Sequence, residues 1–190
     1  MRKIFVPLAL AFACSLLSGE AASKTATISQ EGKAIGEVQI LTPIEVLPGE
    51  GGVTKIKIKG VVNENYQLQI QKNMKEAEIY ATFTNEADAN FKKGKKIEDD
   101  YGEVWYEVEG VYEISSDAVA KDAEALYADA KTNYEQICSA CHRLHEPNSF
   151  TANQWPASMQ EMINANYVAL EGDDLNLIVK YLQHNAKKPE

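Results

Sequence analysis

The chain is poor in side chains that bind metal ions. Among its 190 residues it has three cysteines and three histidines. Two of the cysteines, Cys138 and Cys141, lie close together in the sequence, whereas Cys14 stands alone near the N-terminus. A structural zinc site takes four ligands, and the chain has no second cysteine pair to supply them. A zinc-finger type of domain is therefore excluded.

Positive charge is scarce as well. The chain carries 19 lysine and arginine residues against 28 aspartate and glutamate residues, which gives a formal net charge of −9. Proteins that bind nucleic acid need a cationic surface to hold the phosphates. We therefore exclude nucleic acid as a partner.

Long apolar runs are missing too. The longest run covers residues 4–17 and contains Pro7, so it is shorter than the ~20 residues that cross a bilayer. Arg2 and Lys3 precede the run, and the small-x-small sequence Gly19-Glu20-Ala21 follows it. This order is typical of a secretory signal peptide over residues 1–21, with cleavage after Ala21. We expect export to the periplasm and no integral membrane segment after cleavage.

The chain does contain the sequence Cys138-Ser139-Ala140-Cys141-His142. This is the C-x-x-C-H pattern of covalent c-type haem attachment. The two thiols add to the porphyrin vinyl groups as thioethers, and the adjacent imidazole binds the iron as its proximal ligand. A thioredoxin-like dithiol would follow a strand, whereas this motif ends an alanine-rich helical run. We predict one haem c held by Cys138, Cys141 and His142, with another metal site or a disulfide as the alternatives.

Residues 36–114 show the alternation of antiparallel strands. In residues 55–59, Ile56 and Ile58 share one face and three lysines share the other. The same alternation recurs in residues 66–70, 78–83 and 104–108. Four to six short strands with turn residues between them predict a small antiparallel barrel or sandwich.

Two stretches near this region lack such a pattern. Residues 22–35 are polar without a period and predict a tail before the β domain. Lys92, Lys93, Lys95 and Lys96 predict a solvated loop, with a docking site for a partner as the alternative.

Beyond residue 115 the apolar period becomes helical. Residues 118–137 are rich in helix formers and lead into the C-x-x-C-H motif. Thr151 and Gln154 form a capping box before a second helix, and a last helix begins near Asp173. Residues 115–190 therefore predict an all-α haem domain after the β domain, an α+β chain.

Four side chains are candidates for the sixth ligand of the iron: Met159, Met162 and His184 in the C-terminal part, and the more remote Met74 in the β domain. The ligand must approach the iron from the side opposite His142. Trp155, Met159 and Met162 fall on one helical face, so each methionine is both a possible ligand and a possible core residue. The choice affects the reduction potential, because methionine raises it relative to histidine.

Residues 118–185 resemble a class I-like monohaem cytochrome c domain. Residues 138–145 and 150–156, which read CSACHRLH and FTANQWP, resemble the C-terminal monohaem domain of the pentahaem cytochromes that serve periplasmic trimethylamine N-oxide reductases. The β region resembles the SH3-like segments that can precede such domains. The resemblance implies an SH3-like barrel or sandwich followed by a class I-like domain. It also favours Met162 as the sixth ligand, because a methionine follows the Trp-Pro helix at this spacing.

The same resemblance implies a function in anaerobic respiration. It suggests a periplasmic cytochrome that carries single electrons to a molybdenum S- or N-oxide reductase and receives them from a quinol-linked or cytochrome donor. The chain has one C-x-x-C-H motif and lacks the membrane-anchored tetrahaem part of those cytochromes, which leaves the donor open. One haem moves one electron whereas oxide reduction takes two, so we expect no enzyme activity of its own. The alternative is a haem-based sensor or gas-binding module with an open sixth position.

Overall fold

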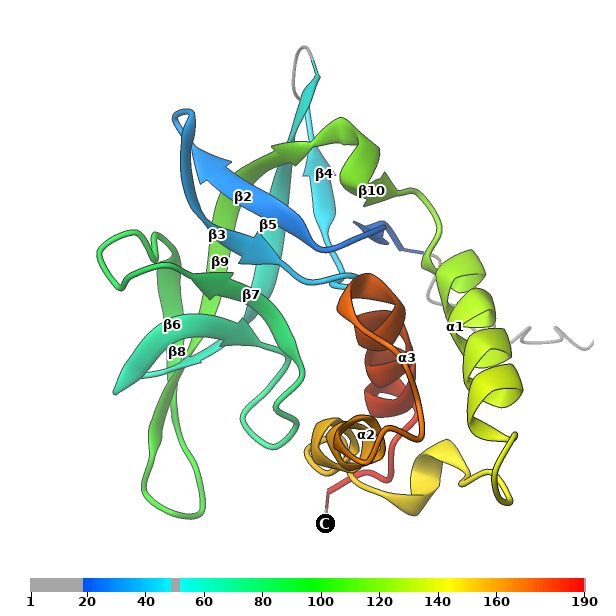
Figure 1. Ribbon diagram of the computed structural model, residues 1–190. Coiled ribbons are helices and arrows are strands. Elements are labelled where there is room, and N and C mark those ends of the chain that lie inside the picture. Colours follow the sequence, from blue (N-terminus) through cyan, green and yellow to red (C-terminus); the bar gives the residue numbers. More distant parts are fainter. Residues whose placement is uncertain (1–18, 49–51, 190) are drawn as a thin grey trace, which may run out of the picture.

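The computed structural model describes residues 19–48 and 52–189, which form strands and helices as drawn in Figure 1. The strands are β1 (Ala21–Ala22), β2 (Ala26–Gln30), β3 (Lys33–Val38), β4 (Glu45–Leu47), β5 (Val53–Asn63), β6 (Tyr66–Gln71), β7 (Ile79–Phe83), β8 (Lys92–Glu98), β9 (Val104–Ser115) and β10 (Val119–Ala120). The helices are α1 (Ala123–Cys138), α2 (Trp155–Asn164) and α3 (Gly172–His184), which lie together on one side of the strands.

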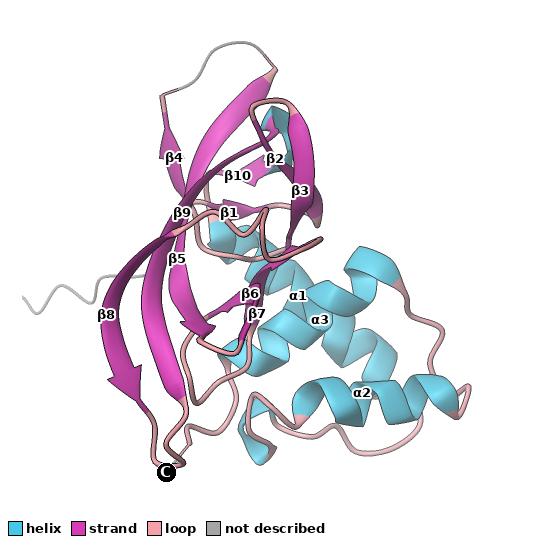
Figure 2. Cartoon of the chain, turned by 90° about the vertical axis from the view of Figure 1, so that its left-hand side faces the viewer, coloured by secondary structure: helices cyan, strands magenta, loops and turns pink. Residues whose placement is uncertain are grey.

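Six of the strands close into an antiparallel barrel in the order β5-β6-β7-β3-β2-β9, and the pairing of β9 with β5 completes the ring. The strands β5 and β9 are the long ones, and they pair with each other from Val53 opposite Ser115 to Asn63 opposite Trp105. Each changes its second neighbour along its length, since β5 pairs with β4 and then β6, and β9 pairs with β8 and then β2. Figure 2 shows β5, β8 and β9 on the side away from the helices.

Alternating side chains fill the barrel. Ile56 and Ile58 are fully buried while the neighbouring Lys55 and Lys59 are exposed, which confirms the alternation predicted for residues 55–59. The other buried residues of this core include Ile28, Val38, Ile70, Phe83, Tyr112 and Ile114. A small barrel of this kind has no room for a ligand inside, because side chains occupy its interior.

Gly36 on β3 permits close packing of two strands. It lies opposite Phe83 on β7, and a Cβ at this position would overlap the carbonyl oxygen of Thr82. We expect Gly36→Ala to lower the free energy of unfolding by about 3 kcal/mol, since overpacking against backbone must displace a strand.

Denaturant unfolding measures this effect, and Gly94→Ala on β8 is the matched control. The nearest atom to a Cβ at Gly94 lies 3.4 Å away, so the neighbours need to move little. An unfolding midpoint of Gly36→Ala as high as that of the control would contradict the prediction.

The structure corrects the predicted fold class. The chain is mostly β, with a closed six-stranded barrel and three helices, and residues 115–190 are not an all-α class I-like cytochrome c domain. The first residues of the predicted helix at 118–137 instead form the short strand β10, which pairs with β1. Ala123 of α1 is buried in one cluster with Ile40 and Leu41, which follow β3. The start of this helix therefore packs against residues of the β part.

The sequence pattern also missed several strands. Residues 22–35, predicted as a polar tail, contain β2 and the first half of β3, and the lysine-rich run predicted as a solvated loop forms the edge strand β8. Most of the predicted signal peptide lies outside the described residues. The predicted cleavage point after Ala21 falls within β1, where Ala21 pairs with Ala120.

The described residues also bear on membrane insertion. Across residues 19–48 and 52–189, no helix combines the length and the apolar character needed to cross a bilayer.

Candidate haem site

The C-x-x-C-H motif lies at the C-terminal end of α1. Asp122 is the N-cap of the helix, and its carboxylate accepts a hydrogen bond from the Glu124 N–H at 2.8 Å. The last residue of the helix is Cys138. Ser139 caps the helix, and Cys141 and His142 follow in the next turn. Both cysteines are free thiols, with Cys138 half-buried and Cys141 exposed. Burial raises the pKa of the Cys138 thiol.

The ring of His142 is oriented for binding a metal through Nε2. Its Nδ1 lies 2.8 Å from the carbonyl oxygen of Arg143. A carbonyl can only accept, so Nδ1 is the donor in this contact, and Nε2 is the ring nitrogen that remains for a metal. A backbone partner on the second ring nitrogen is the usual arrangement for a histidine that ligates a metal. The ring is exposed, so Nε2 is accessible.

A row of aromatic rings leads from His142 into the core of the helical part. The ring centroids of His142 and His145 are 5.6 Å apart, and those of His145 and Phe150 are 5.3 Å apart. Phe150 meets Trp155 edge-on at 4.9 Å, a favourable arrangement for aromatic pairs. The row therefore joins the motif to a tryptophan that is only 2% exposed.

Hydrogen bonds hold the loop after the motif against this row. The Tyr134 hydroxyl donates to the carbonyl oxygen of His145 at 2.8 Å, and the indole N–H of Trp155 donates to that of Pro147 at 2.8 Å. Burial raises the pKa of Tyr134 to about 12, which keeps its hydroxyl protonated and able to donate.

An apolar cluster lies beneath the motif. Cys138, Leu144 and Phe150 pack against a buried group formed by Tyr134, Ala152, Trp155, Met159, Ile178, Leu182 and Ala186. The residues present fit a covalently bound haem in three respects: two free cysteines three positions apart in the sequence, an imidazole whose Nδ1 is held by a backbone carbonyl, and an adjoining apolar surface for the porphyrin.

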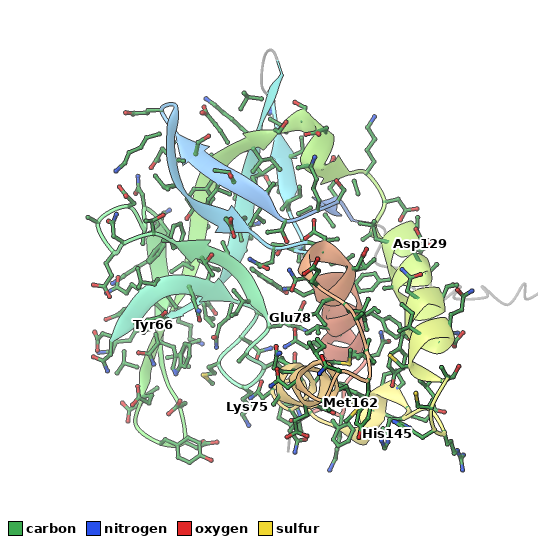
Figure 3. The ribbon with its side chains drawn as sticks, in the orientation of Figure 1. Tyr66, Lys75, Glu78, Asp129, His145 and Met162 are labelled. Atoms are coloured by element: carbon green, nitrogen blue, oxygen red, sulfur yellow. The ribbon has the colours of Figure 1, made fainter. Side chains whose placement is uncertain are left out.

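The structure separates the two methionine candidates. Met159 is 5% exposed and packs within the apolar cluster, which is the common role of a buried methionine. Met162, one turn further along α2, is half-buried and stands outside that cluster. In Figure 3, Met162 and His145 both lie at the lower end of the helical part. Met162 is therefore the methionine whose thioether is not already part of the core.

His184 has a different environment. Its ring packs on Tyr127 with the centroids 4.6 Å apart, and its Nδ1 lies 3.3 Å from the Tyr127 hydroxyl. Both side chains line a cavity of about 340 Å³ together with residues such as Glu124 and Lys131. Burial lowers the pKa of His184, so the ring is neutral near pH 7.

Sequence patterns did not predict a buried charge cluster between the barrel and the helices. Glu78 is 2% exposed and Lys180 of α3 is 5% exposed, and their charged atoms lie 3.6 Å apart. The Lys180 ammonium also donates to the carbonyl oxygen of Ile79. Lys72 reaches the carboxylates of Glu76 at 2.9 Å and Glu78 at 3.2 Å. These charged residues follow no helical or strand period in the sequence, so their proximity could be recognised only from the structure.

Comparison with known proteins gives one distant relative. A cytochrome c-type protein, TorC of Escherichia coli O157:H7, is 22% identical to the chain over 156 residues, which are 81% of this chain and 40% of that protein. The chain thus spans less than half the length of this relative. No protein family and no solved structure matches the chain. Over these residues the chain is thus similar to a protein described as cytochrome c-type.

Proposed function

We propose that the chain is a periplasmic c-type cytochrome that carries single electrons to a molybdenum S- or N-oxide reductase of the trimethylamine N-oxide or dimethyl sulfoxide type. The observation that carries the proposal is the arrangement of His142, which directly follows the free cysteines Cys138 and Cys141 in the sequence and whose Nδ1 is bonded to a backbone carbonyl. The likeness to a cytochrome c-type protein supports the same interpretation.

Different residues would attach the haem, bind its iron and surround it with apolar side chains. Cys138 and Cys141 would hold the haem as thioethers, and His142 would bind the iron as proximal ligand. The haem, when bound, supplies one-electron transfer. Phe150 and the cluster around Trp155 present apolar surface next to the motif, and burial of this kind sets the polarity and hence the reduction potential of a haem.

Electron delivery can be tested directly. The mature chain, expressed with c-type maturation, is reduced with a quinol-linked donor and mixed with a purified molybdenum N-oxide reductase and its substrate. We expect the absorption spectrum of the reduced cytochrome to return to the oxidised form, and the reaction to slow as salt is added, since contacts between electron-transfer proteins are small and depend on charge. A cytochrome that stays reduced would contradict the proposal that a molybdenum N-oxide reductase is its partner.

The sixth ligand is a separate prediction. We expect Met162→Ala to abolish the sulfur–iron charge-transfer band of the oxidised protein, because Met162 carries a thioether outside the core. The reduction potential should fall in the same variant, since loss of methionine ligation lowers it.

Met159→Ala and His184→Ala are the matched variants for this prediction. Met159→Ala should keep the band and lose stability, by about 2 to 5 kcal/mol for a buried methionine. A wild type without the band points to His184. A wild type with a high-spin ferrous form that binds carbon monoxide at once favours a sensor.

A further inference from the structure

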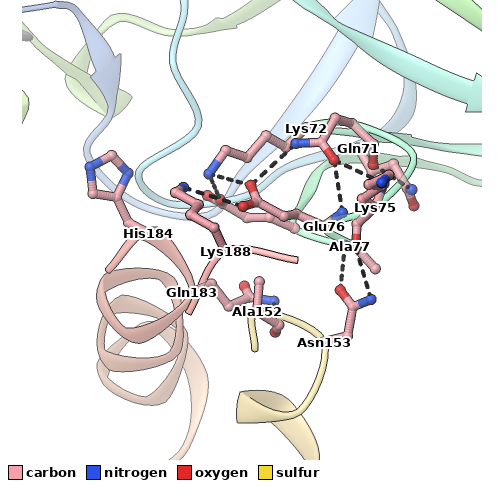
Figure 4. A network of polar contacts seen from close by, with 12 residues as sticks. Gln71, Lys72, Lys75, Glu76, Ala77, Ala152, Asn153, Gln183, His184 and Lys188 are labelled. Carbon is pink, nitrogen blue, oxygen red and sulfur yellow. Dashed lines mark hydrogen bonds and ion pairs between the residues drawn. The ribbon is translucent and has the colours of Figure 1, made fainter. Parts of the chain in front are cut away.

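The loop between β6 and β7, residues 72–78, makes polar contacts with the helical part of the molecule (Figure 4). Asn153 lies in the segment that enters α2, and its side-chain amide pairs with the backbone of this loop. The N–H of Ala77 donates to Asn153 Oδ1 at 2.7 Å, and Asn153 Nδ2 donates to the carbonyl oxygen of Lys75 at 3.1 Å. One side chain therefore joins the barrel to the segment before α2 by two hydrogen bonds.

The loop is also held by hydrogen bonds of its own. Asn73 Oδ1 accepts hydrogen bonds from the N–H groups of Lys75 at 2.9 Å and Glu76 at 2.8 Å. The N–H of Lys72 donates to the carbonyl oxygen of Glu78 at 2.9 Å, which closes the base of the loop. These bonds lie within the loop, so the barrel presents a fixed backbone edge to Asn153.

Two ion pairs extend the contact to α3 and the residues after it. Glu78 lies 3.6 Å from Lys180, and Glu76 lies 3.2 Å from Lys188. Figure 3 accordingly shows Glu78 beside α3 and Lys75 beside α2. The buried amide of Gln183 donates to the carbonyl oxygen of Ala152 at 3.0 Å, which ties α3 to the same segment.

The segment that contains Asn153 also contributes to the row of aromatic rings described above. Asn153 is two residues before Trp155, which packs on Phe150. Phe150 packs on His145, and His145 packs on His142. A shift of the segment at Asn153 would therefore move the apolar surface that adjoins the iron ligand.

We propose that the β6–β7 loop positions one wall of the haem site and that Asn153 is the positioning residue. The barrel would then have a role in electron transfer, because it holds in place the cluster of Phe150 and Trp155 that adjoins Cys138 and would shield a bound haem from water. The inference rests on the proposed function and deepens it. Access of water stabilises the more highly charged oxidised iron, so loosening the wall lowers the reduction potential.

The test compares variants on the two sides of the contact in the haem-loaded protein. Asn153→Ala removes both hydrogen bonds, whereas Asn73→Ala loosens the loop from within the barrel. Asn148→Ala, at an exposed asparagine in the same helical part, is the matched control. The measurements are amide hydrogen exchange of residues 150–156 and the reduction potential.

We expect exchange of residues 150–156 to rise at least about fivefold in either variant, because each variant loses at least two hydrogen bonds and the loss of one net bond already corresponds to about fivefold. The reduction potential should fall in both and stay unchanged in Asn148→Ala. The double variant Asn73→Ala/Asn153→Ala should resemble the single variants, because residues that act through one contact are not additive.

Four results would overturn the inference. An Asn73→Ala variant with normal exchange would show that the loop does not act on the segment, and additive effects would show that the two residues act independently. Faster exchange with an unchanged potential would make the contact merely structural, while the proposed function would stand. A chain that holds no covalent haem would instead overturn the proposed function itself, and this inference with it.

Discussion

Haem is expected to stay with the wild-type chain through acid–acetone extraction, and to be removed completely from a variant with Cys138→Ser and Cys141→Ser. A thioether is a covalent bond that denaturation leaves intact, whereas serine forms no such bond and leaves haem held by ligation alone. The two thiols are free, and they flank the turn that leads to His142. Haem content in the extract and in the precipitated protein measures the effect.

Three further variants separate attachment from ligation. Ser139→Ala changes an exposed residue between the cysteines and should leave covalent haem unchanged. His142→Ala should keep the thioethers and lose the low-spin spectrum, because the imidazole is the expected proximal ligand. His145→Ala should keep both, since His145 contacts the motif only through ring packing. Haem that leaves the wild type on extraction would contradict the assignment of the motif.

The sequence predicted those elements whose two faces differ in burial. Residues 55–59 have a buried and an exposed face, and they lie in β5 as expected. A second helix, α2, also occurs in the predicted region, but its N-cap is Gln154 rather than Thr151 and makes no side-chain cap bond. Of the predicted capping box only one bond forms, in which the Gln154 side chain accepts from the Thr151 N–H at 2.9 Å. A period can be recognised only where packing treats the faces differently.

Elements without such a difference were missed. The edge strand β8 is exposed along almost its whole length, so its lysines had no buried alternation to reveal a strand. Lysines on a sheet edge also discourage pairing with other chains, which gives them a structural role. The residues of β10 are both half-buried and continue an apolar stripe, so they resembled the first turn of the helix that follows.

The failure at the level of fold class has a physical cause. A helical period shows that a helix has an apolar face, and it does not show what that face meets. Ala123, Leu126 and Tyr127 of α1 meet Ile40 and Leu41 from the barrel side rather than only other helices. The contact between Glu78 and Lys180 adds a polar link to the same junction. The helices are thus packed on the barrel, and no separate all-α domain is formed.

The charge cluster at this junction gives the second large prediction. We expect Glu78→Gln to lower the free energy of unfolding by about 3 kcal/mol, because removing one partner leaves the other charge buried without compensation. Lys180 would keep its contact with the Ile79 carbonyl oxygen and lose its ion partner. Glu135→Gln is the matched control: Glu135 pairs with Lys131 at 3.8 Å on the surface, and its loss should cost less than about 0.5 kcal/mol.

A double-variant cycle shows whether the cost arises from the unpaired charge. Lys180→Met replaces the ammonium by a side chain of similar length, so Glu78→Gln/Lys180→Met contains neither charge of the pair. Its loss of stability should be clearly smaller than the sum of the two single losses, since buried ion pairs are often replaced by neutral side chains at little cost. Additive losses in denaturant unfolding would contradict the coupling.

The pH dependence of stability follows from the same burial. Burial lowers the pKa of Lys180 to about 8, and the charge of Glu78 offsets part of this effect. In the unfolded chain the pKa of a lysine is about 10.4. Between about pH 8 and about pH 10.4, Lys180 therefore keeps its proton in the unfolded chain and loses it in the folded chain. The free energy of unfolding therefore gains a contribution that rises with pH from about 8 to about 10.4. Lys180→Met should lose this rise, and a wild type and variant with parallel pH profiles would show that Lys180 keeps its ordinary pKa in the fold.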